Sequence, residues 1–265
     1  MMSYHDAVLL KESVDALSIK EDGVYVDVTF GGGGHSREIL KRLGQKGKLF
    51  AFDQDIDAVK NKIEDERFIL IEENFRHISR YLKFYGVKKV DGILADLGVS
   101  SHQFDEAERG FSIRFDADLD MRMNQNSRLD AKQIINSFSE EKLADILFMY
   151  GELRNSRAIS RKIVSARKEK KIETSFQLRE ILQQFLPKSK EHKILAQIFQ
   201  AIRIEVNEEL EVLKEFLEQT PNLLQPEGRL SIISYHSLED RLVKRYIRTG
   251  FFSGGEPEKD LYGNT

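Results

Sequence analysis

The 265-residue sequence contains no cysteine, and this absence excludes several kinds of chemistry. Without thiols the protein can form no disulfide bond, cysteine-ligated zinc site, iron–sulfur cluster or thiol nucleophile. Only four prolines are present, which argues against long disordered linkers. The sequence also lacks a signal-peptide pattern and any run of ~18 apolar residues, the length that a membrane span needs. We therefore expect a cytoplasmic protein with no membrane partner.

Basic residues are slightly fewer than acidic ones, and the formal net charge is −3. Nucleic-acid-binding proteins are often basic overall, so this balance argues mildly against such a role. The charge is uneven, however, because residues 152–173 contain eight basic and three acidic side chains. A local basic face can hold phosphates on an acidic protein, although a solvated helix face gives the same pattern.

Strand-like and helix-like segments alternate along the first hundred residues. The apolar, β-branched runs predict strands at 24–28, 48–52, 68–71 and 90–95. The segments between them predict helices at 36–43, 56–62 and 78–85, with Gly44 as a left-handed cap after the first. This alternation is typical of an α/β protein with a parallel, doubly wound sheet.

The alternation stops near residue 100, and helical patterns follow. Three polar residues are positioned to cap these helices: Ser139, Thr174 and Asn207. A strand at 229–234 and a helix at 238–247 then restore the α/β pattern. We therefore expect a discontinuous cofactor-binding domain, residues 1–104 and 206–265, interrupted by an all-helical domain at 105–205 that recognises the substrate.

Four consecutive glycines, residues 31–34, follow the first expected strand and open the first expected helix. Glycine lets the backbone turn sharply and approach a ligand closely, beside the N–H groups of the helix. A phosphate-binding loop would need lysine at His35, and a dinucleotide fingerprint would need glycine at Ser36. S-adenosylmethionine (SAM) has no phosphate and needs only the close backbone, so the turn favours SAM over the alternative of a loop without a ligand.

Two aspartates end expected strands on the side where such sheets bind ligands. Asp53 follows the glycine turn by about 20 residues, where an acid accepts hydrogen bonds from ribose hydroxyls. Asp55 and Asp57, by contrast, are typical of charges at a helix N-terminus. Asp96 ends the fourth strand, where its carboxylate would bind an amine of the cofactor or substrate or cap the following turn. The histidines show no metal-ligand spacing, so we expect no metal site.

Six segments with unusual sequences occur in order along almost the whole chain: DVTFGGGGHS (27–36), DGILADLGVSSHQ (91–103), ERGFS (108–112), LDMRMN (119–124), QIFQAIRIEVNEELEVL (197–213) and GRLSIISYHSLEDRLVKR (228–245). Together they resemble the RsmH (MraW) family of bacterial 16S rRNA cytosine-N4 methyltransferases. The resemblance implies a class I SAM-dependent methyltransferase fold, Rossmann-like, with a helical insertion. It also implies that the substrate is a cytidine in the decoding region (P-site) of the small ribosomal subunit.

The resemblance further implies which residues line the SAM site: Gly33, Gly34, His35, Asp53, Phe75, Asp96 and Gln103. Phe75 would pack near the adenine, and Gln103 would reach in from the loop after the fourth strand. The sequence departs from the family at His102, where proline is usual, and at its end, because the family continues through further strands. The C-terminal strands of the sheet would then be missing, as in a truncated or shortened protein of doubtful activity, and the strand at 229–234 would have an exposed edge.

Methylation of cytosine N4 needs help from the protein, because the amino lone pair is delocalised into the ring. A group that accepts hydrogen bonds from the amino protons favours the reactive form of the nitrogen, and Asp96 is the candidate acceptor. The alternative is that Asp96 binds only SAM. His236, after the last expected strand, is a weaker candidate base. The target base must leave the base stack, and the protein must hold the RNA that carries it. Candidate phosphate-binding residues are Arg109, Arg154, Arg157, Arg161, Lys162, Arg167 and Lys168.

Three other functions remain open from the sequence. The first is another SAM-dependent methyltransferase, acting on a different nucleic acid or on a small molecule. The second is an NAD-dependent enzyme, which Ser36 disfavours, and the third is a truncated SAM- or RNA-binding assembly factor without catalysis. The helical insertion and its basic face favour a macromolecular substrate. The oligomeric state is open, a homodimer included.

Overall fold

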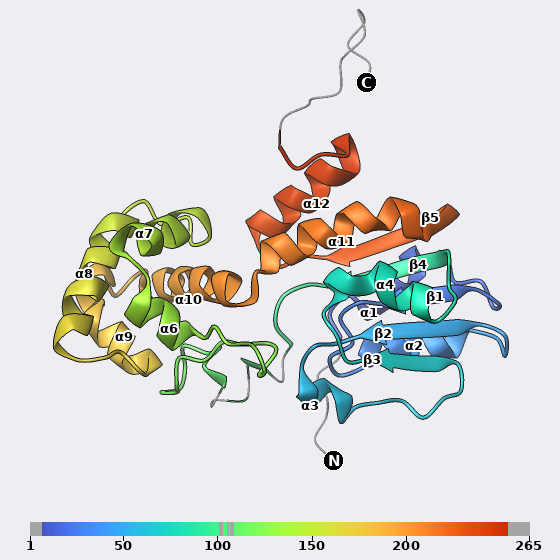
Figure 1. The fold of residues 1–265 in the computed structure, drawn as a ribbon, viewed down its shortest axis with the longest axis horizontal. Coiled ribbons are helices and arrows are strands. Elements are labelled where there is room, and N and C mark those ends of the chain that lie inside the picture. Colours follow the sequence, from blue (N-terminus) through green and yellow to red (C-terminus); the bar gives the residue numbers. More distant parts are fainter. Residues whose placement is uncertain (1–6, 101–102, 105, 107–108, 254–265) are drawn as a thin grey trace, which may run out of the picture. The chain divides into compact units, whose positions relative to one another are not determined.

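The chain divides into two compact units in a computed structural model, which describes residues 7–100, 103–104, 106 and 109–253. The first unit combines Met1–Gly98 with Leu210–Thr265, and the second is Val99–Glu209 (Figure 1). The boundaries that the sequence suggested, at 104–105 and 205–206, lie close to these positions. Within the described ranges, no helix has both the length and the apolar character that crossing a membrane requires.

The first unit is built on a parallel sheet of five strands with the order β3-β2-β1-β4-β5. The strands are β1 (Val24–Asp27), β2 (Lys48–Phe52), β3 (Phe68–Ile71), β4 (Val90–Asp96) and β5 (Leu224–Ile233). This order confirms the predicted α/β class and the doubly wound sheet. It also places β5 at one edge, as the sequence indicated for the strand at 229–234.

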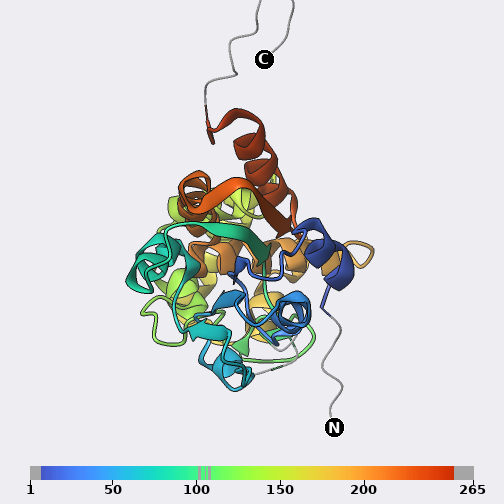
Figure 2. The same cartoon turned by 90° about the vertical axis from the view of Figure 1, so that its right-hand side faces the viewer.

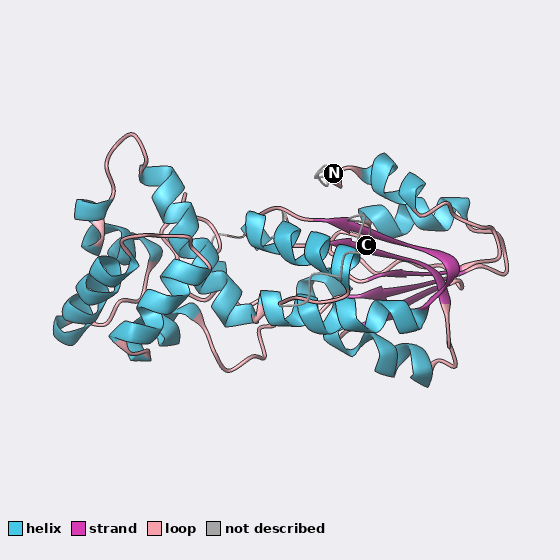
Figure 3. Ribbon diagram, turned by 90° about the horizontal axis from the view of Figure 1, so that it is seen from above, coloured by secondary structure: helices cyan, strands magenta, loops and turns pink. Residues whose placement is uncertain are grey.

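Helices cover both faces of this sheet (Figure 3). They are α1 (Leu10–Ala16), α2 (Gly34–Arg42), α3 (Ile56–Val59), the short 3₁₀ helix η1 (Phe75–His77), α4 (Ile78–Phe84), α11 (Glu209–Leu223) and α12 (Ser237–Thr249). Successive residues of a strand point to opposite faces. Tyr25 therefore packs with Val14 and Ile39 of α1 and α2, whereas Val26 packs with Leu82 and Phe216 of α4 and α11.

Two local predictions in this unit are wrong. The helix after β2 ends at Val59 rather than Lys62, because Asn61 is in a turn and its side-chain amide donates to the carbonyl of Gly31. Gly44 is not a left-handed cap. Helix α2 ends on an extended Leu43, and the amide of Gly44 donates to the carbonyl of Glu21 at 2.8 Å instead.

The second unit is helical. The elements given for its described residues are α6 (Ala131–Ser137), α7 (Glu140–Met149), α8 (Ser156–Glu169), α9 (Ser175–Ile181), the 3₁₀ helix η3 (Gln183–Phe185) and α10 (Glu191–Asn207). The capping predictions for Ser139 and Thr174 are confirmed, since each side chain accepts from a backbone N–H of its helix. Apolar residues of these helices, Ile134, Leu147 and Ile163 among them, form one buried cluster.

Asn207 does not cap a helix, contrary to the prediction. It is the last residue of α10, and its side-chain oxygen accepts from the backbone N–H of Met123 at 2.7 Å. Its side-chain nitrogen donates to the carbonyl of Met121 at 2.8 Å. The Asn207 side chain therefore fastens the irregular segment around residues 121–123 to the end of α10.

Candidate active site at the carboxyl ends of the strands

The glycine turn after β1 has the conformation that its sequence indicates. Gly31 and Gly33 have φ angles of 49° and 75°, in the left-handed region that favours glycine. A Cβ on Gly33 would lie 2.9 Å from the Phe30 ring and from the guanidinium of Arg37. The turn therefore depends on glycine at position 33 both for backbone conformation and for space.

Asp53, at the end of β2, holds this turn in place. One carboxylate oxygen accepts from the backbone N–H of Gly31 at 2.7 Å, and the other accepts from the backbone N–H of Asp55 at 2.8 Å. Burial raises the pKa of Asp53 to about 6, although both hydrogen bonds oppose this rise. Asp55 itself caps α3 by accepting from the N–H of Asp57, which confirms the helix N-terminal role predicted for this pair.

Asp27 is a fully buried carboxylate at the end of β1, and sequence reasoning did not single it out. It accepts from the hydroxyl of Ser36 at 2.7 Å and from the backbone N–H of Thr29 at 3.2 Å. Burial raises the pKa of Asp27, while nearby His35 and the Ser36 hydroxyl lower it. The serine that breaks the dinucleotide fingerprint therefore has a definite role, which is to hold Asp27.

Asp96 ends β4 and is the centre of a second polar group. Its Oδ1 accepts from the hydroxyl of Tyr235 at 2.7 Å, and its Oδ2 lies 3.9 Å from Nδ1 of His35. The other ring nitrogen of the buried His35 lies 3.1 Å from the carbonyl of Val8. Burial raises the pKa of Asp96, and the Tyr235 hydrogen bond and His35 lower it. Tyr235 was missed from the sequence; its only signal was its position next to His236.

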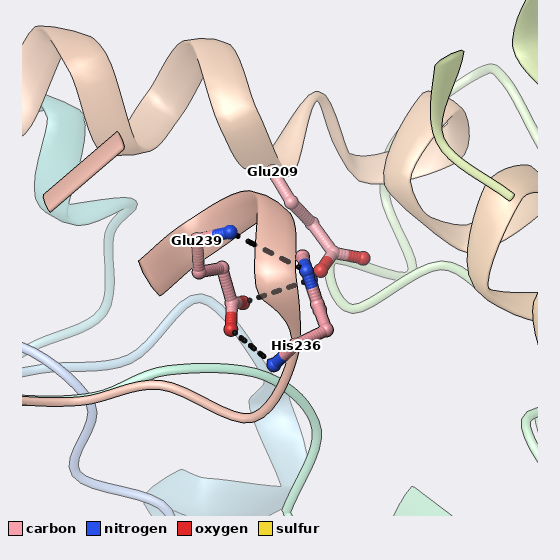
Figure 4. A group of neighbouring side chains, drawn as sticks. All are labelled: Glu209, His236 and Glu239. Carbon is pink, nitrogen blue, oxygen red and sulfur yellow. Dashed lines mark hydrogen bonds and ion pairs between the residues drawn. The ribbon is translucent and has the colours of Figure 1, made fainter. Parts of the chain in front are cut away.

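His236 caps the N-terminus of α12, and Figure 4 shows its ring beside Glu239 in the first turn of that helix. Its Nδ1 accepts from the backbone N–H of Glu239, and its Nε2 lies 3.2 Å from the buried Glu239 carboxylate. Glu239 in turn accepts from the backbone N–H of Tyr235 at 2.9 Å. Nδ1 of His236 is therefore occupied by the helix cap, whereas Nε2 makes no hydrogen bond within the described residues.

Phe75 and Gln103 have different surroundings. Phe75 begins η1, in the segment after β3, and its ring meets Phe216 edge-on at a centroid distance of 5.3 Å. Gln103 belongs to the second unit, where its buried side chain accepts from the backbone N–H of Ser100 at 3.0 Å. The first unit therefore contains six of the seven predicted SAM residues, and Gln103 is not among them. His102 lies outside the described residues.

The donor and acceptor set at this edge of the sheet fits SAM. Three carboxylates end neighbouring strands: Asp27, Asp53 and Asp96. SAM offers hydroxyl and ammonium groups, whose hydrogen bonds carboxylates accept, and a positively charged sulfur, which carboxylates attract. A dinucleotide pyrophosphate needs free N–H donors instead. The N–H groups of Gly31 and Gly33 already donate to Asp53 and to the carbonyl of Phe30.

Five of the seven predicted RNA-binding residues are exposed on the second unit: Arg154, Arg157, Arg161, Lys162 and Lys168. Arg157, Arg161 and Lys168 share one side of α8, since they are spaced by four and seven residues. Arg161 also forms an exposed ion pair with Glu140 at 3.4 Å. This stripe is accessible to a polyanion.

The other two predicted RNA-binding residues bind backbone carbonyls. Arg167 donates to the carbonyls of Ile135 and Phe138, both at 2.6 Å, and so closes the end of α6. Burial lowers the pKa of its guanidinium. Arg109 donates to the carbonyl of Arg122 at 2.8 Å. These bonds assign both side chains a structural role within the second unit.

A parallel sheet of this order, with a glycine turn after β1 and acids ending β2 and β4, defines the class I methyltransferase fold. The sequence pattern of the MraW methylase family matches residues 2–253, so the chain belongs to this family of methyl-transferring enzymes.

Curated relatives agree over nearly the whole chain. The ribosomal RNA small subunit methyltransferase H of Christiangramia forsetii is 67% identical over 264 residues, which cover 100% of this chain and 87% of the relative. The protein of the same name from Flavobacterium johnsoniae is 62% identical over 263 residues, covering 99% and 87%. The one from Flavobacterium psychrophilum is 64% identical over 255 residues, covering 96% and 87%.

Proposed function

We propose that this protein transfers a methyl group from SAM to N4 of a cytidine in the decoding region (P-site) of 16S rRNA, in the cytoplasm. The observation that carries the proposal is the group of carboxylates at the ends of β1, β2 and β4, beside a glycine turn. The names of the curated relatives supply the class of substrate, a ribosomal RNA of the small subunit.

Gly33, Gly34, His35, Asp53, Phe75 and Asp96, all in the first unit, would hold SAM. Asp53 would accept from the ribose hydroxyls, which requires its ionised form. Phe75 would supply an aromatic surface for the adenine. When bound, SAM supplies an electrophilic methyl group on a positively charged sulfur.

Asp96 is the residue that we propose acts on the substrate. Tyr235 already donates to its Oδ1, whereas its Oδ2 lies 3.9 Å from His35, beyond hydrogen-bonding distance. An Oδ2 that accepts from the cytosine amino group would favour the reactive nitrogen and remove its developing positive charge. Because burial raises the pKa of Asp96, this carboxylate is a stronger proton acceptor than an exposed aspartate. We leave His236 outside the catalytic set, because its Nδ1 caps α12 and only 10% of its side chain is exposed.

RNA would be held in part by the second unit. Arg154, just before α8, is exposed, as are Arg157 and Lys162 within the helix, and Arg161 and Lys168 extend the basic surface. Such side chains hold backbone phosphates without reading sequence. Their contribution would be affinity for the RNA strand that carries the target cytidine.

The test is a reaction of the purified chain with SAM and small ribosomal subunits that lack the modification, followed by mass spectrometry of the nucleosides. We expect N4-methylcytidine in 16S rRNA, at a single position in the decoding region. A different methylated base would identify another nucleic-acid methyltransferase. SAM and RNA binding without any methylated product would identify a non-catalytic assembly factor, and either result would contradict the proposal.

A further inference from the structure

Helix α12 carries a stripe of positive charge along most of its length. Four basic residues recur at positions i, i+3, i+4 and i+7: Arg241, Lys244, Arg245 and Arg248. This spacing places all four on one side of a helix. Each of them is exposed. We refer to these four residues as the α12 stripe.

The opposite side of α12 is apolar and packs against the first unit. Leu242, Val243 and Tyr246 are partly buried against the cluster that contains Leu213 and Phe216 of α11. In Figures 1 and 2, α12, drawn in red, lies at the outer side of α11, drawn in orange. Packing of the apolar side therefore fixes the α12 stripe in an outward orientation.

The α12 stripe begins close to the candidate active site. Helix α12 starts at Ser237, two residues after Tyr235, whose hydroxyl donates to Asp96. Arg241 lies in the second turn, and Arg248 follows in the last turn. At 1.5 Å per residue, the four charges extend over roughly 10 Å of the helix. The same compact unit thus contains both the carboxylates and a short track of cations that leads away from them.

Stabilisation of the helix itself does not explain the whole stripe. Basic residues favour the C-terminus of a helix, but the effect falls off within the last turn, and Arg248 is the member of the stripe in that turn. Lys244 pairs with Asp240 at 3.0 Å, yet the two side chains are 75% and 46% exposed, and such a pair contributes little. A weak, solvated pair of this kind leaves the Lys244 ammonium accessible to a stronger anionic partner.

We propose that the α12 stripe binds backbone phosphates of the RNA strand that delivers the target base, an inference that rests on the proposed function. A polyanionic strand complements four exposed cations in one row, and phosphate contacts fix the position of a strand relative to a site. A lipid surface is the less suitable partner. A helix that binds in a membrane interface must insert its apolar side, and in α12 that side is occupied by the core.

The experiment compares the double variant R241Q/R248Q with the matched control K83Q/K88Q. Lys83, in the last turn of α4, and Lys88, just before β4, are exposed residues of the same unit at the other end of the strands from the candidate site. Initial rates are measured with unmodified small ribosomal subunits, and binding of a 16S rRNA fragment is measured at several salt concentrations. SAM affinity is measured by calorimetry on all three proteins.

For R241Q/R248Q we expect KM for the subunit to rise at least tenfold, while kcat and SAM affinity stay within about twofold of the wild type. The slope of log K against log salt for the RNA fragment should become shallower by about 1.4, because each single-strand phosphate that the variant no longer neutralises contributes ~0.7. The variant R241K/R248K should restore both quantities, and the control should match the wild type.

An unchanged KM and salt slope in R241Q/R248Q would overturn the proposal, and so would equal losses in the control. Binding to anionic phosphatidylserine vesicles that R241Q/R248Q abolishes, with RNA binding unchanged, would assign the α12 stripe to a lipid surface instead. The RNA-binding measurement does not depend on turnover. If the wild type makes no N4-methylcytidine, the proposed reaction fails on its own evidence, and the salt slope still decides whether the α12 stripe binds RNA.

Discussion

The hydroxyl of Tyr235 donates a hydrogen bond of 2.7 Å to the carboxylate of Asp96, from a position 139 residues further along the chain. This bond joins the segment after β5 to the end of β4. It occupies one oxygen of Asp96, and the other oxygen lies near His35 at 3.9 Å. The catalytic proposal depends on this geometry, because it determines which oxygen is open to a substrate amino group.

Replacing Asp96 with Asn should abolish most of the methyl transfer while preserving the fold. The amide cannot take up the charge that develops on the amino nitrogen, so we expect single-turnover rates to fall by about 10²–10⁴-fold. SAM affinity, measured by calorimetry, should change by less than about tenfold. Unchanged turnover in the variant would exclude Asp96 as the acceptor, and loss of SAM binding alone would restrict it to the cofactor.

The variant Tyr235→Phe should shift the pH dependence of the reaction. The Tyr235 hydrogen bond lowers the pKa of Asp96 against the effect of burial, so its removal should raise that pKa further. Because the ionised carboxylate is the proposed acceptor, the acid limb of kcat/KM should move to higher pH. The control is Tyr246→Phe, which makes the same chemical change at a tyrosine that stacks on Phe252. Its pH profile is measured alongside. Superimposable profiles of all three proteins would contradict the role of Tyr235.

The variant Ser36→Ala should destabilise the first unit. It removes the hydroxyl of Ser36 that donates to the buried carboxylate of Asp27, which costs about 1–3 kcal/mol. The pKa of Asp27 is raised by burial, so the folded state holds this proton more tightly than the unfolded state does. Stability from this group is therefore greatest at acid pH and falls as pH rises toward the folded-state pKa. Because the Ser36 hydroxyl stabilises the ionised form, the destabilisation should be larger above the folded-state pKa of Asp27 than below it.

Urea unfolding over a series of pH values measures the effect of Ser36→Ala. Ser165→Ala, at an exposed position of α8, makes the same chemical change without a buried partner. It should stay within about 0.5 kcal/mol of the wild type. An equal effect of the two substitutions would show that the hydrogen bond between Ser36 and Asp27 contributes no stability.

Gly33→Ala should destabilise the protein more than Gly86→Ala does. The two glycines have φ angles of 75° and 74°, so the left-handed backbone costs each alanine roughly 1–2 kcal/mol. Only at position 33 does the added Cβ also approach the Phe30 ring, at 2.9 Å; at position 86 nothing lies within 4 Å. Urea unfolding should separate the two variants, and calorimetry should show weakened SAM binding for Gly33→Ala alone. Equal results would remove Gly33 from the site.

Much of the fold could be predicted from the sequence because it depends on local patterns. The apolar runs indicated all five strands of the sheet, and the polar residues Ser139 and Thr174 correctly marked helix starts. Errors occurred where a distant interaction decides the local structure. Asn207 has the residue type of a helix cap, but its amide binds the segment at Met121–Met123, which is more than eighty residues away.

The candidate site was predictable only in part, for the same reason. The glycine turn and the strand-ending Asp53 and Asp96 are visible in the sequence, because their chemistry follows from their position in a doubly wound sheet. Tyr235 and Asp27 were not singled out, since their importance comes from hydrogen bonds with Asp96 and Ser36 in the folded chain. Arg167 was counted with the exposed basic residues, although it closes the end of α6.

Calorimetric titration of SAM at several pH values, into the wild type and into Asp53→Asn, tests the central claim most directly. Burial raises the pKa of Asp53 to about 6, and ribose hydroxyls would bind its ionised form. Wild-type affinity for SAM should therefore be micromolar at pH 7.5, weaken as pH falls through 6, and show no counterpart with NAD. The variant should bind SAM about tenfold more weakly at pH 7.5, with little change down to pH 5. A folded wild type that binds NAD instead, or that does not bind SAM at any pH, would contradict the assignment of this site.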